Sequence, residues 1–169
     1  MKTNKHVIWD FVSKNQKRFQ ELADKVWSTP ETCYSEQNSM SAHVDELIYH
    51  GFSVTKGIAN IPTAVVGEYG TDGPIIAFLG EYDALAGLSQ KADVFHQDPV
   101  KKGENGHGCG HNLLGSASMQ AAVALKEWLK DVNLPGVVRY YGCPAEEGGA
   151  AKTFMAVSYT HLRAHETLR

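Results

Sequence analysis

The chain has 169 residues, of which 43% are hydrophobic and 21% charged, values that are typical of a folded globular protein and exclude a disordered one. This length suits one ordinary domain. The net charge of -3 gives no basic surface for nucleic acid, so we expect a small molecule as the binding partner.

Cysteine usage and hydropathy favour a cytoplasmic protein. Cys33, Cys109 and Cys143 are far apart and odd in number, which does not indicate a disulfide framework. Charged residues interrupt Met1–Asn15, so no apolar signal segment is indicated, and no apolar run approaches membrane-spanning length. We therefore expect a cytoplasmic protein without a membrane contact.

Two amphipathic helices are predicted at the start of the chain. In residues 5–28, apolar residues recur mostly at helical spacing until Pro30 ends the pattern. Residues 36–49 repeat this arrangement, and Gly51 follows where a C-terminal glycine cap belongs. We interpret His43 and His50 on the second helix as exposed polar residues.

Short β-branched and aromatic runs follow at 52–55, 63–66 and 75–79, separated by glycine and proline. The third run, IIAFL, is apolar throughout, which is typical of a strand buried on both faces. We therefore predict an α/β fold with a mainly parallel sheet flanked by helices. Glu81 and Asp83 follow the third run, at the sheet edge that usually binds ligands. Two acids solvating a loop are the alternative.

The densest group of candidate ligands lies in Glu104–Gly115, ENGHGCGHNLLG. His107, Cys109 and His111 alternate there with glycines, which let the backbone fold tightly around an ion. Thiolate and imidazole are ligands that Zn²⁺ and similar ions prefer. A glycine-rich turn with an inert cysteine is the alternative. The clustering disfavours it, because the chain has only 3 cysteines and 8 histidines.

A long helix is predicted directly after this group. Asn112 is its expected N-cap, and Leu114 and Leu125 belong to its expected apolar face. Cys109 and His111 would then lie at a helix N-terminus, whose partial positive charge favours a thiolate.

A second acidic pair, Glu146 and Glu147, follows an expected strand at 137–143. Adjacent glutamates on a loop point in different directions, so one can bind an ion while the other faces water. Metal-dependent hydrolysis needs both an anionic ligand and a base for the water. Two solvated glutamates opening the next helix are the alternative. This alternative is the weaker of the two, because it would require three ligand-rich segments to lie at one sheet edge by coincidence.

The segments GEYDAL, NGHGCGHN and CPAEEGG, in this order, resemble the zinc-dependent amidohydrolase and aminoacylase family of metallopeptidases, in particular its p-aminobenzoyl-glutamate hydrolase branch. The resemblance implies part of a zinc-peptidase-like catalytic domain, with the family's lid domain absent. It implies hydrolysis of an amide bond in N-acyl amino acids, small peptides or aminobenzoyl-glutamate conjugates. It also implies one or two divalent ions, Zn or Mn, and a homodimer for the full-length parent.

The resemblance carries specific roles to five residues. Cys109, His111 and Glu147 would bind the metal. Glu146 would be the general base that activates water. Asp83 would support the site from behind the ligands.

Two residues of the motifs receive no firm role. Glu81 stands where many relatives outside this branch have a ligand histidine, and His107 is not a usual ligand.

Two other functions also fit the residues. One is a non-catalytic metal-binding module held by Cys109, His111 and Glu147. The other is a hydrolase with Cys109 as its nucleophile and His107 or His111 as its base.

The resemblance ends near Val157. Residues 157–169 continue neither the helix suggested by Ala151 and Met155 nor a strand pattern, and they resemble a translated sequencing adapter. We therefore expect residues 1–156 to be the N-terminal part of the catalytic domain and residues 157–169 to be a non-native tail. We also expect the 169-residue chain to be inactive by itself.

Overall fold

The computed structural model describes residues 4–166, and the side chains of residues 6–158 within them. Its helices and strands lie within a few residues of the predicted ones. In chain order they are α1 (Asn4–Trp27), α2 (Gln37–Tyr49), β1 (Ser53–Lys56), the 3-10 helix η1 (Ile58–Asn60), β2 (Val65–Tyr69), β3 (Ile75–Glu81), α3 (His111–Asp131), β4 (Val137–Cys143), α4 (Glu146–Gly149) and α5 (Ala151–Glu166). No helix among these residues is long and apolar enough to cross a membrane.

The described strands form one four-stranded sheet in the order β1-β2-β4-β3. The predicted α/β class is confirmed, but the sheet is mixed instead of mainly parallel. β2 pairs antiparallel with both β1 and β4, and β3 pairs parallel with β4. The reason is the length of the connections, since a short one makes a hairpin of β1 and β2, whereas α3 carries the crossover from β3 to β4.

The prediction that β3 is buried on both faces is wrong. Ile75, Ile76 and Leu79 expose 44%, 45% and 50% of their surface, because β3 is an edge strand of the sheet. Phe78, on the same strand, packs against the main core. An apolar run of this length therefore indicated a strand correctly, but not its place in the sheet.

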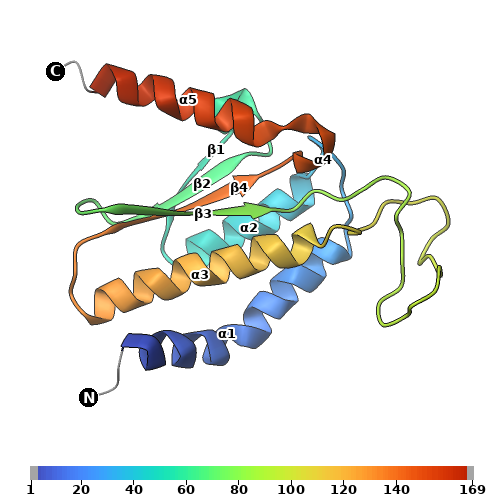
Figure 1. The fold of residues 1–169 in the computed structure, drawn as a ribbon, viewed down its shortest axis with the longest axis horizontal. Helices are drawn as coiled ribbons and strands as arrows, with labels where there is room; N and C mark the ends of the chain where they lie inside the picture. Colours follow the sequence, from blue (N-terminus) through green and yellow to red (C-terminus); the bar gives the residue numbers. More distant parts are fainter. Residues whose placement is uncertain (1–3, 167–169) are drawn as a thin grey trace.

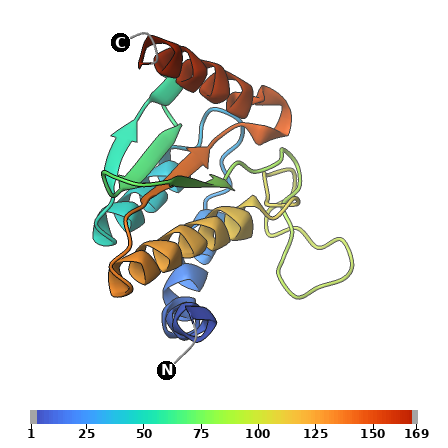
Figure 2. The same ribbon diagram turned by 60° about the vertical axis from the view of Figure 1, so that its left-hand side comes forward.

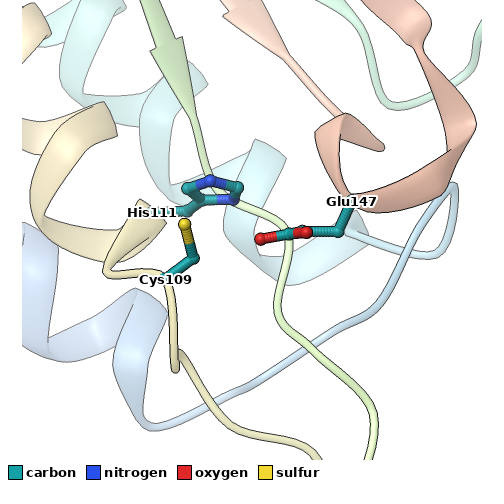
Figure 3. Close-up of side chains that lie close together, drawn as sticks. All are labelled: Cys109, His111 and Glu147. Atoms are coloured by element: carbon teal, nitrogen blue, oxygen red, sulfur yellow. The ribbon is translucent and has the colours of Figure 1, made fainter.

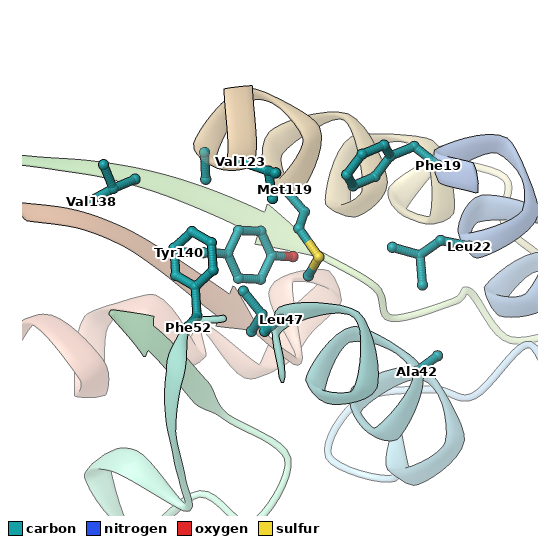
Figure 4. Close-up of a cluster of buried hydrophobic side chains, with 10 residues drawn as sticks. Phe19, Leu22, Ala42, Leu47, Phe52, Met119, Val123, Val138 and Tyr140 are labelled. Atoms are coloured by element: carbon teal, nitrogen blue, oxygen red, sulfur yellow. The ribbon is translucent and has the colours of Figure 1, made fainter. Parts of the chain in front are cut away.

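Helices cover both sides of the sheet (Figure 1). α1, α2 and α3 lie on one side, and α5 crosses the other, as the rotated view also shows (Figure 2). The main core lies between the first three helices and the sheet (Figure 4). It consists of Phe19, Leu22, Ala42, Leu47, Phe52, Met119, Ala122, Val123, Val138 and Tyr140. α5 packs Ala151 and Met155 against Ile61, Ala64, Cys143 and Ala145.

The predicted glycine cap of α2 is confirmed. Gly51 has a φ of 77°, which favours glycine because a Cβ would be strained there. The N–H of Gly51 donates to the Ile48 carbonyl at 2.9 Å and that of Phe52 to the Leu47 carbonyl at 3.0 Å. These two bonds form a Schellman motif, which turns the chain from α2 into β1.

The two histidines of α2 are not exposed, contrary to the prediction. His43 is fully buried, with its ring centroid 4.9 Å from that of Tyr82 and 6.1 Å from that of Tyr140. The side chain of His50 is 10% exposed, and its ring stacks on Phe19. Both lie on the helix face that meets α1, α3 and the sheet, so aromatic neighbours replace water around them.

The start and the buried face of α3 also differ from the prediction. The helix begins at His111 and its N-cap is Gly110, with a φ of 77°, so Asn112 is not the cap. Asn112 instead lies in the first turn, and its side chain donates to the Ala23 carbonyl. Leu114 is 45% exposed, whereas Met119 is fully buried. The buried face is built around small residues that allow α3 close to β3.

α5 continues past the boundary predicted near Val157. Its backbone is helical from Ala151 to Glu166, so the expectation that the helix pattern stops there is wrong. The prediction that residues 157–169 are non-native remains a prediction, and residues 167–169 lie outside the described residues.

Candidate metal centre

The parallel pairing of β3 with β4 places two acidic segments at one sheet edge. Glu81 is in register with Cys143, so the chain leaves both strands at the same level. Asp83 follows one strand and Glu147 the other, and the N–H of Glu147 donates to Asp83 Oδ2 at 2.9 Å. The predicted meeting of ligand-rich segments at one edge is therefore confirmed for these two.

His111, the first residue of α3, brings the third segment to this edge. Its Nδ1 lies 2.9 Å from Asp83 Oδ1, and the imidazole is buried. Burial opposes ionisation of Asp83, but the hydrogen bonds from His111 and from the Glu147 N–H outweigh it, so the pKa of Asp83 lies below its usual value. The bond to Asp83 in turn raises the pKa of His111. Asp83 thus fixes both the His111 ring and the backbone of Glu147.

The other ring nitrogen of His111 faces two more carboxylates. Its Nε2 lies 3.0 Å from Glu81 Oε2 and 3.8 Å from Glu146 Oε2. Glu81 is buried and its other carboxylate oxygen pairs with Lys152 of α5, while the side chain of Glu146 is 42% exposed. Nε2 is therefore paired with Glu81, a contact that a bound cation would replace, and Glu146 is the carboxylate that water can reach.

Cys109 completes a second group of possible ligand atoms around the same ring. Its thiol, the His111 ring and the Glu147 carboxylate converge from three segments (Figure 3). One ligand atom from each of these residues lies within 4.8 Å of the others, and the same is true of Glu81, His111 and Glu146. His111 belongs to both groups, which together could hold one ion or two.

The residues present fit a divalent cation. The hydrogen bond to Glu147, followed by burial and further carboxylates, raises the pKa of Cys109. We expected the helix N-terminus to favour the thiolate of Cys109. The neighbouring carboxylates have the opposite and larger effect, so they favour the protonated thiol. A cation would reverse this balance, because it attracts the thiolate and the carboxylates together. The pairing of Asp83 with His111 Nδ1 is also the arrangement that orients a metal-binding imidazole.

His107 lies outside both groups of candidate ligands. Its Nε2 is 3.1 Å from the carbonyl oxygen of Val26, at the end of α1, and burial lowers its pKa. The ring therefore ties the glycine-rich segment to α1. The low rank given to His107 as a ligand agrees with this position. The raised pKa of Cys109 also disfavours the reading in which Cys109 is a nucleophile.

Two charged residues near the site were missed by the sequence analysis. Lys152 of α5 pairs with Glu81 of β3. The Glu36 carboxylate accepts the N–H of Ala145, the residue before Glu146. No motif around Lys152 in the sequence indicated that it lies near the site. Glu36 was hidden because an acid at the start of a helix is usually interpreted as a helix cap.

Comparison with known proteins gives relatives that are named as hydrolases and dipeptidases. A p-aminobenzoyl-glutamate hydrolase subunit from Escherichia coli (strain K12) is 49% identical over 148 residues, which cover 88% of this chain and 31% of the relative. The chain is therefore a homologue of this hydrolase subunit. No family model matches it. The chain spans about a third of the length of the curated relatives with which it aligns over most of its residues.

Solved structures show that the chain has the fold of part of two larger proteins, one of which is a metal-binding peptidase. A dinuclear metal-binding peptidase of the M20 family from Bacillus subtilis superposes with a TM-score of 0.70 at 23% identity, over 88% of this chain and 40% of that one. An aminobenzoyl-glutamate utilization protein from Klebsiella pneumoniae superposes with a TM-score of 0.63 at 15% identity, over 90% and 43%. The sheet and helices described above therefore have the fold of part of each of these two proteins.

Proposed function

We propose that this chain carries one side of the active site of a metal-dependent amidohydrolase. The observation that carries the proposal is the His111 ring, which is held by Asp83 through Nδ1 and faces carboxylates with Nε2. Homology to the Escherichia coli hydrolase subunit supports the same reading.

Cys109, His111 and Glu147 are the residues that would hold the ion. Zn²⁺ suits a donor set of thiolate, imidazole and carboxylate, and Mn²⁺ is the second candidate. The second group shares His111 with the first, but its Glu146 is the proposed base and its Glu81 pairs with Lys152, so we propose the group around Cys109 as the ion site. When bound, such a cation supplies Lewis acidity to the substrate carbonyl and lowers the pKa of a water molecule.

Glu146 is proposed as the general base. Its partly exposed carboxylate shares the space in front of His111 Nε2. It takes a proton from the attacking water, whose oxygen bonds to the amide carbon. It then returns that proton to the leaving nitrogen as the carbon–nitrogen bond breaks. Asp83 holds His111 and the Glu147 backbone in place during these steps.

The proposed substrates are N-acyl amino acids, small peptides or aminobenzoyl-glutamate conjugates. The name of the Escherichia coli relative supports the last class, and a relative from Mus musculus named Xaa-Arg dipeptidase supports the second. The Escherichia coli relative is named as one subunit of its hydrolase, which supports an assembly of several chains. A homodimer of the full-length protein remains a prediction.

A single substitution tests the proposal. Metal content and hydrolysis of p-aminobenzoyl-glutamate, N-acetyl amino acids and dipeptides are measured for the product of the complete source gene and for its Glu146→Gln variant. We expect Glu146→Gln to retain the metal and to lose activity by about 10²–10⁴-fold, as for loss of a general base. Glu21→Gln, an exposed position on α1, is the matched control and should retain full activity.

The other outcomes separate the alternatives. Full activity of Glu146→Gln would mean that Glu146 is not the general base, and it would favour another base or Cys109 as a nucleophile. No activity in either protein, with the metal bound, would favour the non-catalytic module. Structural zinc sites usually have four protein ligands. Among the described residues, the group around Cys109 offers three.

A further inference from the structure

Glu36 is a fully buried acid at the N-cap position of α2, yet it does not cap that helix. Glu31 does so instead, because its carboxylate accepts the N–H groups of Asn38 and Ser39, each at 2.9 Å. The first turn of α2 is thus satisfied without Glu36. The carboxylate of Glu36 turns away from its own helix.

Glu36 instead binds the loop that carries the two site glutamates. Its Oε1 accepts the N–H of Ala145 at 2.9 Å, across 109 positions of the sequence. The same oxygen accepts the N–H of Tyr34 at 2.9 Å. Ala145 is the residue before Glu146. This one carboxylate oxygen therefore joins the start of α2 to the end of β4.

The Ala145 backbone needs such a partner. Its φ is 52°, in the left-handed region that an alanine rarely adopts without support. Ala150, on the other side of the loop, has a φ of 49°. A loop with a strained residue at each end holds its shape only when surrounding contacts fix it. The Ala145 N–H is buried, so the Glu36 bond also satisfies a donor that water does not reach.

The far end of the loop is held by the same turn. The Tyr34 hydroxyl donates to the Gly149 carbonyl at 2.6 Å. A Cβ added at Gly149 would lie 2.6 Å from the Cys33 sulfur, so the two segments are in close contact. Residues 33–36 therefore contact the 145–149 loop at both ends, with Glu146 and Glu147 between the two attachments.

A carboxylate is a costly choice for packing alone. Burial raises the pKa of Glu36, although contact with the Thr63 hydroxyl and the N–H groups of Ala145 and Tyr34 opposes that shift. An apolar side chain would fill the same space without burying a charge. What a carboxylate adds is an acceptor that reaches Ala145 and Tyr34 at once.

We propose that Glu36 is a positioning residue of the active site, whose carboxylate oxygen holds Ala145 so that Glu146 and Glu147 face His111. The inference rests on the proposed function, because it concerns the same site. The inference adds that a residue at the start of α2 determines the position of the proposed base, Glu146. Tyr34 serves the other end of the loop in the same way.

The test compares two substitutions of Glu36 in the metal-loaded product of the complete source gene. Glu36→Ala removes the acceptor, and we expect kcat to fall about 10–100-fold, as for a small displacement of a reacting group. KM should change less than about threefold, because Glu36 touches no substrate. Glu36→Gln keeps an acceptor oxygen and should recover kcat to within about threefold of the wild type. Glu31→Gln is the matched control: it should lower Tm and leave kcat unchanged.

Amide hydrogen exchange of Ala145 gives a readout that does not depend on catalysis. We expect exchange at Ala145 to be at least about tenfold faster in Glu36→Ala than in the wild type, with Glu36→Gln close to the wild type. If Glu36→Ala does not fold, Tyr34→Phe replaces it. That variant loses only the bond to the Gly149 carbonyl, and its kcat should fall at constant KM.

Several results would overturn the inference. One is wild-type kcat in Glu36→Ala, or in Tyr34→Phe where that variant replaces it, while Glu146→Gln is inactive. Equal losses in Glu36→Ala and Glu36→Gln would also overturn it, since charge and not the acceptor would then matter. An active Glu146→Gln would instead refute the proposed function. In that case the exchange rate at Ala145 alone decides whether Glu36 holds the loop.

Discussion

His43 makes the stability of the fold depend on pH. Its Nδ1 donates to the Ser39 carbonyl at 2.9 Å, and its Nε2 is buried without a hydrogen-bond partner among the described residues. Tyr82 and Tyr140 flank the ring, and Glu46 is the nearby charge that favours its protonation. A second proton would have to sit on Nε2, where no acceptor receives it. Burial therefore lowers the pKa of His43 from 6.5 to about 4.

The sign of the effect follows from the two protonation states. Between pH 6.5 and about 4 the unfolded chain binds a proton at His43 and the folded chain does not. The free energy of unfolding therefore falls as pH falls through this window and levels below it. Each pH unit is worth about 1.4 kcal/mol, so the full loss is about 3 kcal/mol.

Two measurements check this value. Urea unfolding at pH 7 and pH 4 is compared for the wild type and His43→Gln, which cannot titrate. Acids such as Asp83, whose pKa is lowered in the fold, contribute equally to both proteins and cancel in the difference. We expect the wild type to lose about 3 kcal/mol more than the variant between these pH values. An NMR titration that gives the His43 ring a pKa near 6.5, or parallel losses in both proteins, would refute the reasoning.

Two further predictions concern the site and its support. Asp83→Asn should weaken Zn²⁺ binding about 10–100-fold in a chelator competition, because the amide cannot accept from both His111 and the Glu147 N–H; an affinity within twofold of the wild type would contradict this. Gly115→Ala should lower the free energy of unfolding by about 1–3 kcal/mol. A Cβ there would lie 2.3 Å from the Glu81 carbonyl oxygen and 2.8 Å from His43 Nε2. A neutral effect in urea unfolding would show that α3 can move away from β3 at no cost.

Local patterns were sufficient to predict the long helices and the strands, but not η1 or α4. Periodicity of 3.6 and 2 residues separated helices from strands, and Gly51 marked a helix end because its backbone angle suits only glycine easily. The direction of strand pairing was not predictable in this way. Pairing depends on which strands become neighbours, and the apolar run of β3 reads the same in an edge strand as in a central one.

The candidate site was predictable where chemistry is dense in the sequence. Cys109 and His111 are close together along the chain, and Glu147 follows a strand end, so spacing indicated the segments; the family resemblance then selected the three residues that the fold brings together. His43 and Glu36 could not be found in this way. Each is a polar residue on an ordinary helix, and its burial is decided by segments far along the chain.

The burial of α3 illustrates the same limit. Leucines such as Leu114 suggested one face, but close approach to β3 requires the face that carries Gly115. A pattern of hydrophobic residues cannot show that a small residue is needed for contact. The contact distance between two backbones has to be known first.

X-ray absorption of the Zn²⁺-loaded protein tests the central claim most directly, because it measures the ligands themselves. The account predicts one sulfur at about 2.3 Å with nitrogen and oxygen neighbours at about 2.0–2.2 Å, and loss of the sulfur contribution in Cys109→Ser. A spectrum with nitrogen and oxygen ligands only, unchanged by Cys109→Ser, would contradict the assignment of Cys109, His111 and Glu147 as the metal centre.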